Sequence, residues 1–369
     1  MKKPKAKMGQ VDFILFATIM ILVSIGIIMV YSASSYTALH SKAYGYDDMF
    51  FLKKQGLWAI IGITFMIISE KIDYHIFKKY TGILMIITIA LLCAVFAFPD
   101  NHGARRWIYL PGGASIQPSE IAKYMVVLYL AKSIEQKGEK IKTFKYGILP
   151  YLLVSGFFAG LVLLEKNLSI ASVIMIVTVI VLFSAGCRKK DITLVLSLVF
   201  AAGVTFTVLE SYRMRRFMSF LNPWEDPKGD GYQLIQSLLA LGSGGMLGMG
   251  LGQSRQKCYY IPEPHNDFIF SIIGEELGLI GCIAVICLFL VFIWRGIKIA
   301  IRAKDIFGTL LAVGITGVIA IQAIINIAVV TGSMPVTGVP LPFISYGGSS
   351  LLFNLIAMGV LLNISRQTT

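Results

Sequence analysis

One acidic residue, Asp267, stands at the start of a long apolar run. It belongs to the segment 262–270 (PEPHNDFIF), and the apolar residues continue to about Trp294. An ionisable group in a membrane span costs several kcal/mol unless it faces protein or water, so such a group is a functional candidate. Where a helix leaves the membrane, a carboxylate can meet a substrate that is itself half lipid and half water-soluble.

A second polar group stands at the start of another apolar run, in the segment 117–123 (QPSEIAK). Pro118 and Ser119 favour the start of a helix. Glu120 and Lys123 are three residues apart and therefore share one helix face. The pair either steadies a short helix as a local ion pair or lines a polar cavity, and both interpretations can hold together.

Cationic side chains precede this group and recur in a long connection further along the chain. The segment 101–107 (NHGARRW) ends in Arg105, Arg106 and Trp107. Arg binds phosphate in a bidentate manner and Trp favours a membrane interface, so this segment is either a phosphate contact or an interfacial anchor. The connection 210–266 carries Arg213, Arg215, Arg216, Lys228, Arg255 and Lys257. Six cations there indicate an anionic ligand.

The segment 332–350 contains three prolines and four glycines and also holds Ser345 and Tyr346. Such turn chemistry fixes an irregular backbone close to the membrane. Irregular backbone is tolerated at that depth only where protein or a water-filled cavity supports it. We therefore expect this loop to form part of a site.

The composition is that of a membrane protein. Hydrophobic residues make up 56% of the 369 residues and charged residues only 14%, with a mean hydropathy of +0.75. A soluble enzyme needs far more charge to cover its surface. The net charge of +13 suggests nucleic acid at first, but the basic residues cluster in short connections between apolar runs. That pattern indicates membrane topology and no nucleic-acid partner.

Apolar runs long enough to cross a bilayer recur along the chain. We predict an all-α polytopic membrane protein, one integral membrane domain over 1–369, with a long extracytoplasmic loop (209–266) between spans seven and eight. The distribution of Lys and Arg places both termini in the cytoplasm. Within the loop, residues 232–241 are expected to form a short amphipathic helix. The ten predicted spans cover about 11–33, 55–70, 79–98, 119–133, 148–165, 167–186, 192–209, 267–294, 306–330 and 348–364.

Several of these segments together resemble one known family. The segments 335–338 (PVTG) and 341–350 (LPFISYGGSS) are similar to the signature of the SEDS proteins RodA, FtsW and SpoVE. The resemblance extends to 222–227 (NPWEDP), 248–254 (GMGLGQS), 267–278 and 117–123, and thus covers essentially the whole chain. The segments 222–227 and 252–257 (GQSRQK) are closer to the FtsW and SpoVE branch.

One segment departs from the family pattern. The family commonly carries a Pro-Asp-Leu-Gly-like motif after the fifth span, whereas this chain has 165–169 (EKNLS). The proline, the aspartate and the glycine are absent. A role for this connection in the present chain is therefore open.

The resemblance implies a peptidoglycan glycosyltransferase that polymerises lipid II at the outer face of the cytoplasmic membrane, by inverting transfer from a polyprenyl-pyrophosphate donor, in division, elongation or sporulation. We assign Asp267 as the base, or alternatively as ligand of a divalent cation, Mg²⁺ or Mn²⁺; no organic cofactor is expected. Polymerisation needs a base and cationic help for the leaving pyrophosphate. The expected substrate or pyrophosphate contacts are Arg106, Lys123, Glu120, Arg213, Arg216, Arg255, Lys257, Ser345 and Tyr346.

Two other functions stay open: a lipid II flippase and a non-catalytic scaffold for a transpeptidase. A flippase needs polar groups through the depth of the bundle, and Glu275 and Glu276 lie deeper than Asp267, by roughly 12 Å at 1.5 Å per helical residue. A polymerase needs its polar groups at the outer face. The expected partners are lipid II, a class B penicillin-binding protein and other membrane proteins of the divisome or elongasome.

Overall fold

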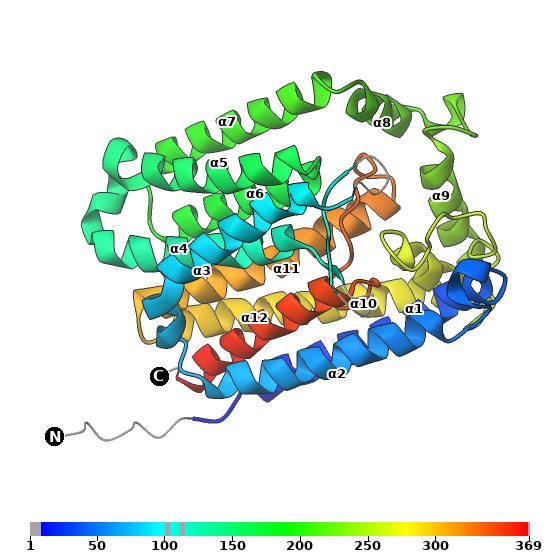
Figure 1. Ribbon diagram of the computed structural model, residues 1–369, viewed down its shortest axis with the longest axis horizontal. Coiled ribbons are helices and arrows are strands. Elements are labelled where there is room, and N and C mark those ends of the chain that lie inside the picture. The colour runs from blue at the N-terminus through cyan, green and yellow to red at the C-terminus, as the bar shows by residue number, and fades with distance from the viewer. Residues whose placement is uncertain (1–8, 100–103, 111–114, 368–369) are drawn as a thin grey trace.

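The computed structural model describes residues 9–99, 104–110 and 115–367. Ten long helices dominate it, and two shorter helices, α8 (Ser211–Leu221) and α9 (Tyr232–Gly244), lie between the seventh and eighth of them (Figure 1). The long helices are α1 (Phe13–Leu39), α2 (Phe50–Lys71), α3 (His75–Ala94), α4 (Pro118–Lys137), α5 (Leu149–Leu164), α6 (Leu168–Ser184), α7 (Lys189–Val208), α10 (Ile269–Arg302), α11 (Ile306–Val330) and α12 (Gly348–Arg366).

Short elements connect the helices. A two-stranded antiparallel hairpin, β1 (Ile108–Tyr109) with β2 (Ser115–Ile116), stands just before α4. The remaining turns are the 3₁₀ helices η1 (Lys42–Tyr44), η2 (Val95–Ala97), η3 (Gly138–Lys142) and η5 (Pro223–Glu225), and the π turn η4 (Phe144–Ile148).

The predicted all-α polytopic membrane fold is confirmed. In the described residues, eight helices are long and apolar enough to cross a membrane. The other two long helices are α4, which carries the polar group at its start, and α6, which is apolar but has 17 residues. Each of the ten predicted spans coincides with one long helix, whereas α8 was not expected. That all ten helices cross the membrane stays a prediction.

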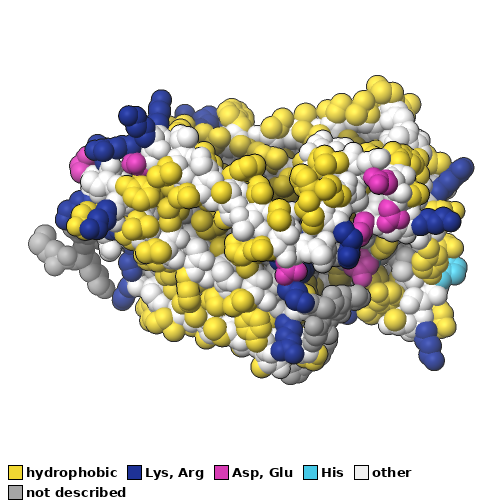
Figure 2. Space-filling model, turned by 90° about the horizontal axis from the view of Figure 1, so that it is seen from above, with side chains coloured by type: hydrophobic (Ala, Val, Ile, Leu, Met, Phe, Trp, Pro, Cys, Tyr) yellow, Lys and Arg dark blue, Asp and Glu magenta, His cyan; other side chains and the backbone are white. Residues whose placement is uncertain are grey.

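The bundle has a buried centre and an exposed rim. In both α11 and α12, 72% of the most apolar window is buried, against 11% in α7, which runs along the edge of the bundle in Figure 1. On the face shown in Figure 2, apolar side chains cover much of the surface, and Lys and Arg lie at the left, at the right and near the lower middle. Such an apolar exterior suits contact with lipid tails.

The two ends of the bundle carry different chain segments. The carboxylate of Asp12 pairs with Arg295, so the start of α1 lies beside the last turns of α10. Asp267, which precedes α10, therefore lies at the opposite end. We call that end the loop end; it holds the connections 40–49, 165–167, 209–268 and 331–347 and the described residues between α3 and α4.

Helix α10 is broken inside the bundle. Gly278 has φ 68° and ψ −167°, a left-handed conformation that favours glycine. The glycine-rich segment after α9 fills the break: its Met249 and Gly250 donate backbone hydrogen bonds to carbonyls before Gly278, and its carbonyls accept two from beyond it. This exchange satisfies backbone groups that would otherwise lie unpaired at membrane depth.

Candidate active site

The segment that carries Asp267 is held by the last connection, 331–347. The Ser345 hydroxyl donates to the carbonyl of Asn266 at 2.8 Å, and the Tyr346 N–H donates to the carbonyl of His265 at 2.9 Å. From α11, the side-chain amide of Asn326 donates to the carbonyl of Asp267 at 2.7 Å and to Val339 at 2.8 Å. The proline- and glycine-rich loop therefore fixes the position of the candidate base.

The carboxylate of Asp267 is half-buried and faces this loop. Its Oδ2 lies 3.1 Å from the place where a Cβ would stand on Gly338, so only a glycine leaves this space open. Burial, together with the negative charge of Glu263, raises the pKa of Asp267 to about 6. The positive charges of Arg216 and Arg106 act in the opposite direction. A carboxyl with this pKa is mostly ionised at pH 7 and is a stronger base than an exposed aspartate.

The two arginines whose charges act on Asp267 belong to different elements. Arg216, on α8, donates from Nη1 to the carbonyl of Val336 at 3.4 Å and so connects α8 with the last loop. Arg106, just before β1, donates from Nε and Nη2 to the carbonyls of Glu165 and Lys166 at 3.3 and 2.5 Å. Two guanidinium groups beside one carboxylate suit a doubly charged phosphate ligand.

The connection that departs from the family pattern holds Arg106. After α5, the N–H groups of Lys166 and Asn167 donate back to Leu163 and Val162, and Lys166 adopts φ 58°, where glycine is usual. The Asn167 side chain then accepts from the N–H of Ile170 at 3.2 Å and caps α6. This tight turn directs its carbonyls toward Arg106 without the missing proline, aspartate and glycine.

Glu120 and Lys123 form the predicted ion pair on one face of α4. Lys123 Nζ lies 2.9 Å from Glu120 Oε2, and both side chains are buried. Lys123 also donates to Gln322 Oε1 at 2.9 Å, and Ser350 at the start of α12 donates to Glu120 at 2.7 Å. The pair is therefore more than a local clamp, because it joins α4 to α11 and α12.

Helix α11 links this pair to Asp267. Gln322, which binds Lys123, and Asn326, which binds the carbonyl of Asp267, are one turn apart. The starts of α4 and α10 at the loop end thus contact the same stretch of α11. Lys123 and Asp267 consequently belong to one continuous polar region, as expected for residues of one site.

Several buried polar atoms in this region have no hydrogen-bond partner among the described residues. A buried polar group without a partner costs about 1–3 kcal/mol, so its presence indicates a polar group still to be bound, water or ligand. The atoms at the loop end are Ser119 Oγ, both carboxyl oxygens of Glu165, Gln256 Oε1, His265 Nδ1, Gln322 Nε2, Asn326 Oδ1 and Thr337 Oγ1.

Lys257, predicted as a pyrophosphate contact, is buried and bonded to another acidic residue. Its Nζ lies 2.9 Å from Glu276 Oε1 and donates to the carbonyl of Gly252 at 2.7 Å. Glu276 also accepts from the hydroxyl of Ser32 on α1. Glu275 next to it accepts from backbone N–H groups and a hydroxyl of residues 254–256. Both glutamates therefore anchor the glycine-rich segment to the bundle.

Two other predicted cations lie at the surface of the loop end. Arg213 donates to the carbonyl of Phe206 at 3.0 Å and folds back on the end of α7. The side chain of Arg255 is exposed, and its backbone N–H binds Glu275. Neither is among the residues whose charge acts on Asp267. Their assignment as pyrophosphate contacts stays a prediction, as do those of the other site residues; Asn101, His102 and Gly103 lie outside the described residues.

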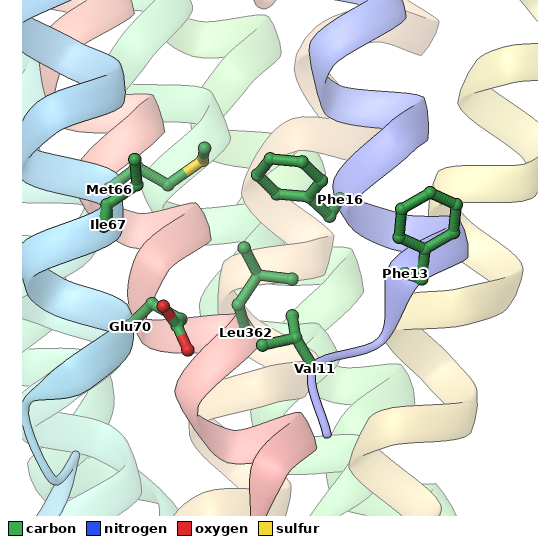
Figure 3. Close-up of a pocket in the computed structure, with 7 residues that line it drawn as sticks. All are labelled: Val11, Phe13, Phe16, Met66, Ile67, Glu70 and Leu362. Atoms are coloured by element: carbon green, nitrogen blue, oxygen red, sulfur yellow. The ribbon is translucent and has the colours of Figure 1, made fainter.

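A cavity of about 290 Å³ lies at the end of the bundle opposite Asp267 (Figure 3). Apolar side chains of α1, α2 and α12 line most of it, including Phe13, Phe16 and Met66, with Glu70 at its edge. Such a lining provides no group for transfer chemistry. The cavity is therefore not part of the candidate site.

Four site residues were missed by sequence reasoning. Gln322 and Asn326 stand four apart within an apolar run, which is a recognisable signal of a polar helix face. Burial lowers the pKa of His265 to about 4, so its ring is neutral, and it packs at a tilt against Phe51 with the ring centroids 4.2 Å apart. Glu165 follows an apolar run and gave no signal of burial, because its inward direction depends on the turn at Lys166.

In the part of the chain that the structure describes, no three His, Cys, Asp or Glu side chains converge as a metal site. Mg²⁺ usually keeps several waters and is bound by one or two carboxylates together with substrate phosphates. The half-buried carboxylate of Asp267 fits that mode of binding.

Comparison with known proteins gives matches over nearly the full length. Residues 12–369 match the FtsW, RodA and SpoVE family, described as "Cell cycle protein". The chain is 44% identical to a probable peptidoglycan glycosyltransferase FtsW of Geobacter sp. (strain M18), covering 96% of this chain and 97% of that protein. It is 46% identical to stage V sporulation protein E of Bacillus subtilis (strain 168), covering 97% of each.

A solved structure shares the fold. It belongs to a peptidoglycan synthase complex described for its structural coordination of polymerization and crosslinking. The TM-score is 0.78 at 28% identity, with 96% of this chain and 98% of that chain covered. The arrangement of all ten long helices is therefore similar to that of a protein of known structure.

Proposed function

Because the chain belongs to the FtsW, RodA and SpoVE family, we propose that it is a peptidoglycan glycosyltransferase that polymerises lipid II into glycan strands. The observation that carries the proposal is Asp267, a half-buried carboxylate at the loop end on which the positive charges of Arg106 and Arg216 both act. The names of its relatives support the same reaction. Division, elongation and sporulation remain equally compatible with the site.

The proposed substrate matches the site in chemistry. Lipid II joins an apolar polyprenyl tail, an anionic pyrophosphate and a polar disaccharide-peptide. The apolar helix surfaces suit the tail, and Arg106 and Arg216 suit the pyrophosphate. The buried atoms without partners, such as Asn326 Oδ1 and Thr337 Oγ1, suit the hydroxyl and amide groups of a sugar.

Asp267 would act as the general base. It takes the proton of the acceptor sugar hydroxyl while that oxygen bonds to the anomeric carbon of the donor. The bond from this carbon to the pyrophosphate oxygen breaks, and the configuration inverts. Arg106 and Arg216 stabilise the charge that develops on the leaving pyrophosphate. Asp267 could alternatively hold a Mg²⁺ or Mn²⁺ ion, which would share that charge when bound.

We also propose an orientation in which the loop end faces the outside of the cytoplasmic membrane and both termini face the cytoplasm. The short connections at the terminal end are rich in Lys and Arg, which is typical of the cytoplasmic side. In this orientation Asp267 meets substrate in the outer leaflet. Reporter fusions at the chain termini and in the connection 209–268 test the orientation.

A partner transpeptidase is the third part of the proposal. Glycan strands without peptide crosslinks carry no load, and the related solved chain comes from a complex that combines polymerization with crosslinking. We expect a class B penicillin-binding protein whose membrane helix packs against the bundle. Other membrane proteins of the divisome or elongasome would join it.

The main observation in favour of a flippase has another explanation in this structure. Glu275 and Glu276 suggested a deep polar path, but both carboxylates are occupied by Lys257, Ser254 and backbone N–H groups. A scaffold without activity would not need Asp267.

Incubation of the purified protein with fluorescent lipid II, with and without the partner, distinguishes the polymerase, flippase and scaffold functions. Glycan strands support the polymerase, whereas transfer of lipid II across vesicles without strands supports the flippase.

A further inference from the structure

Glu165 is a buried carboxyl group that the proposed mechanism does not use. Its side chain is 0% exposed, and it lies in the tight turn between α5 and α6 at the loop end. Neither carboxyl oxygen has a hydrogen-bond partner among the described residues. An ionised carboxylate in such a place is strongly disfavoured unless a positive charge accompanies it.

Among the residues that the structure describes, few polar groups face Glu165 from the surrounding elements. The hydroxyl of Ser119 at the start of α4 and the charge of Arg106 both favour its ionised form, but burial has the larger effect. Further along α4, Glu120 and Lys123 are paired with each other. The side chain of Lys166, in the same turn, is exposed. Arg106 is therefore the cation that responds to the charge of Glu165.

Burial raises the pKa of Glu165 to about 8, so at pH 7 the group holds its proton. Arg106 binds the turn through the backbone carbonyls of Glu165 and Lys166, not through the carboxyl group. The charge of the same guanidinium acts on Asp267. The charge of one cation thus acts on two carboxyl groups, of which one is ionised and the other neutral.

We propose that Glu165 is a titratable positioning residue of this site. While it keeps its proton, Arg106 remains directed to the anion beside Asp267. When Glu165 releases its proton to solvent, its carboxylate competes for the guanidinium and withdraws it from the pyrophosphate of the substrate. This inference rests on the proposed function for the identity of that anion.

Anion binding near Arg106 and protonation of Glu165 should favour each other. An anion bound near Arg106 favours the protonated form of Glu165, so by linkage the protonated form binds the anion more tightly. Binding of the polyprenyl-pyrophosphate donor should weaken as the pH rises past about 8. One pH unit above that pKa the carboxyl is about nine-tenths ionised, so KM should rise about tenfold. The value of kcat should change far less.

The test compares the ratio of KM at pH 9 to KM at pH 7 among variants of the full-length protein. We expect about tenfold for the wild type and a ratio near one for Glu165→Gln, which has no proton to lose. Glu165→Asp keeps a carboxyl and should retain a rise. Glu135→Gln is the matched control, because Glu135 is on α4 near its other end and pairs with Lys78; it should keep the wild-type ratio.

Two results would overturn the proposal. One is a Glu165→Gln variant that keeps the full alkaline rise in KM. The other is a variant whose KM and kcat change by the same factor at every pH, since that indicates a packing defect alone. Thermal unfolding of each variant shows whether the protein is folded in the assay.

Two readouts do not require turnover and separate this inference from the proposed function. Infrared spectroscopy should show a protonated carboxyl band that titrates near pH 8 and is missing in Glu165→Gln. Binding of undecaprenyl pyrophosphate should weaken about tenfold between pH 7 and pH 9 in the wild type only. If both hold but no glycan forms, the proposed function fails and the role of Glu165 stands. If glycan forms and neither holds, Glu165 has no such role.

Discussion

At the scale of single residues, the chemistry of this protein depends on how far burial removes each ionisable group from water. Asp267 and Glu165 are both carboxyl groups near Arg106, yet burial raises the pKa of the first to about 6 and of the second to about 8. The first is therefore ionised and the second protonated at pH 7. Two environments thus assign different roles to similar side chains.

The acid limb of the profile of kcat/KM against pH should follow the protonation of Asp267. Below pH 6 this carboxyl gains a proton and can no longer accept one from the sugar hydroxyl. We expect kcat/KM to fall about tenfold for each pH unit below 6. Initial rates of strand formation between pH 4.5 and 7.5 measure this limb. A profile that stays flat down to pH 4.5 would remove Asp267 from the role of base.

Gly338 leaves the space that Asp267 needs. A Cβ at this position would stand 3.1 Å from Oδ2, so Gly338→Ala should displace the carboxylate while folding is preserved. The contact requires a shift of a few tenths of an ångström, and because about 1 Å at a reacting group can cost on the order of 100-fold in rate, we expect a several-fold loss of polymerisation rate. Gly156→Ala on α5 is the control, since nothing lies within 4 Å of its Cβ position. Equal polymerisation rates for the two variants would contradict this role of Gly338.

At the scale of elements, the helices were predictable and their interruptions were not. Apolar runs located all ten long helices because length and hydropathy are properties of consecutive residues. The break at Gly278 depends on the segment after α9 that enters it, and no local pattern records that contact. The same holds for the site residues. The spacing of Glu120 and Lys123 predicted their pairing, whereas the places of Asn326 and Glu165 in the site depend on tertiary structure.

The buried pair of Lys257 and Glu276 is predicted to hold the glycine-rich segment to α10. Lys257→Met leaves Glu276 as a buried charge without its cation, which costs about 3–5 kcal/mol. Thermal unfolding in detergent should show a clear loss of stability, partly recovered when Glu276→Gln is added. Lys228→Met, at an exposed position, is the control. If Lys257→Met keeps its stability but loses donor binding, Lys257 is the pyrophosphate contact that the sequence suggested.

At the scale of the whole molecule, the bundle has a buried centre and an exposed rim. Helices α11 and α12 are largely enclosed and position the site from within, whereas α7 and α8 lie at the edge. Arg216 on α8 is one of the two arginines beside Asp267. Any partner that moves α8 therefore changes the charge at the site.

This arrangement predicts activation by a transpeptidase partner. We expect the class B penicillin-binding protein to raise the polymerisation rate and to slow amide hydrogen exchange in α8, because a partner stimulates by favouring one conformer. Exchange in α12 should stay unchanged, since it is already enclosed. A complex that forms without either effect would confine the partner to crosslinking.

The central claim is that Asp267 performs the transfer chemistry at the loop end. The most direct measurement is glycan-strand formation from fluorescent lipid II by purified wild type and Asp267→Asn, each with its partner. The amide keeps the shape of the side chain and loses its basicity and its affinity for a metal ion. We predict that the variant folds, binds the partner and forms no strands. Strand formation at the wild-type rate by a folded Asp267→Asn protein would contradict the account.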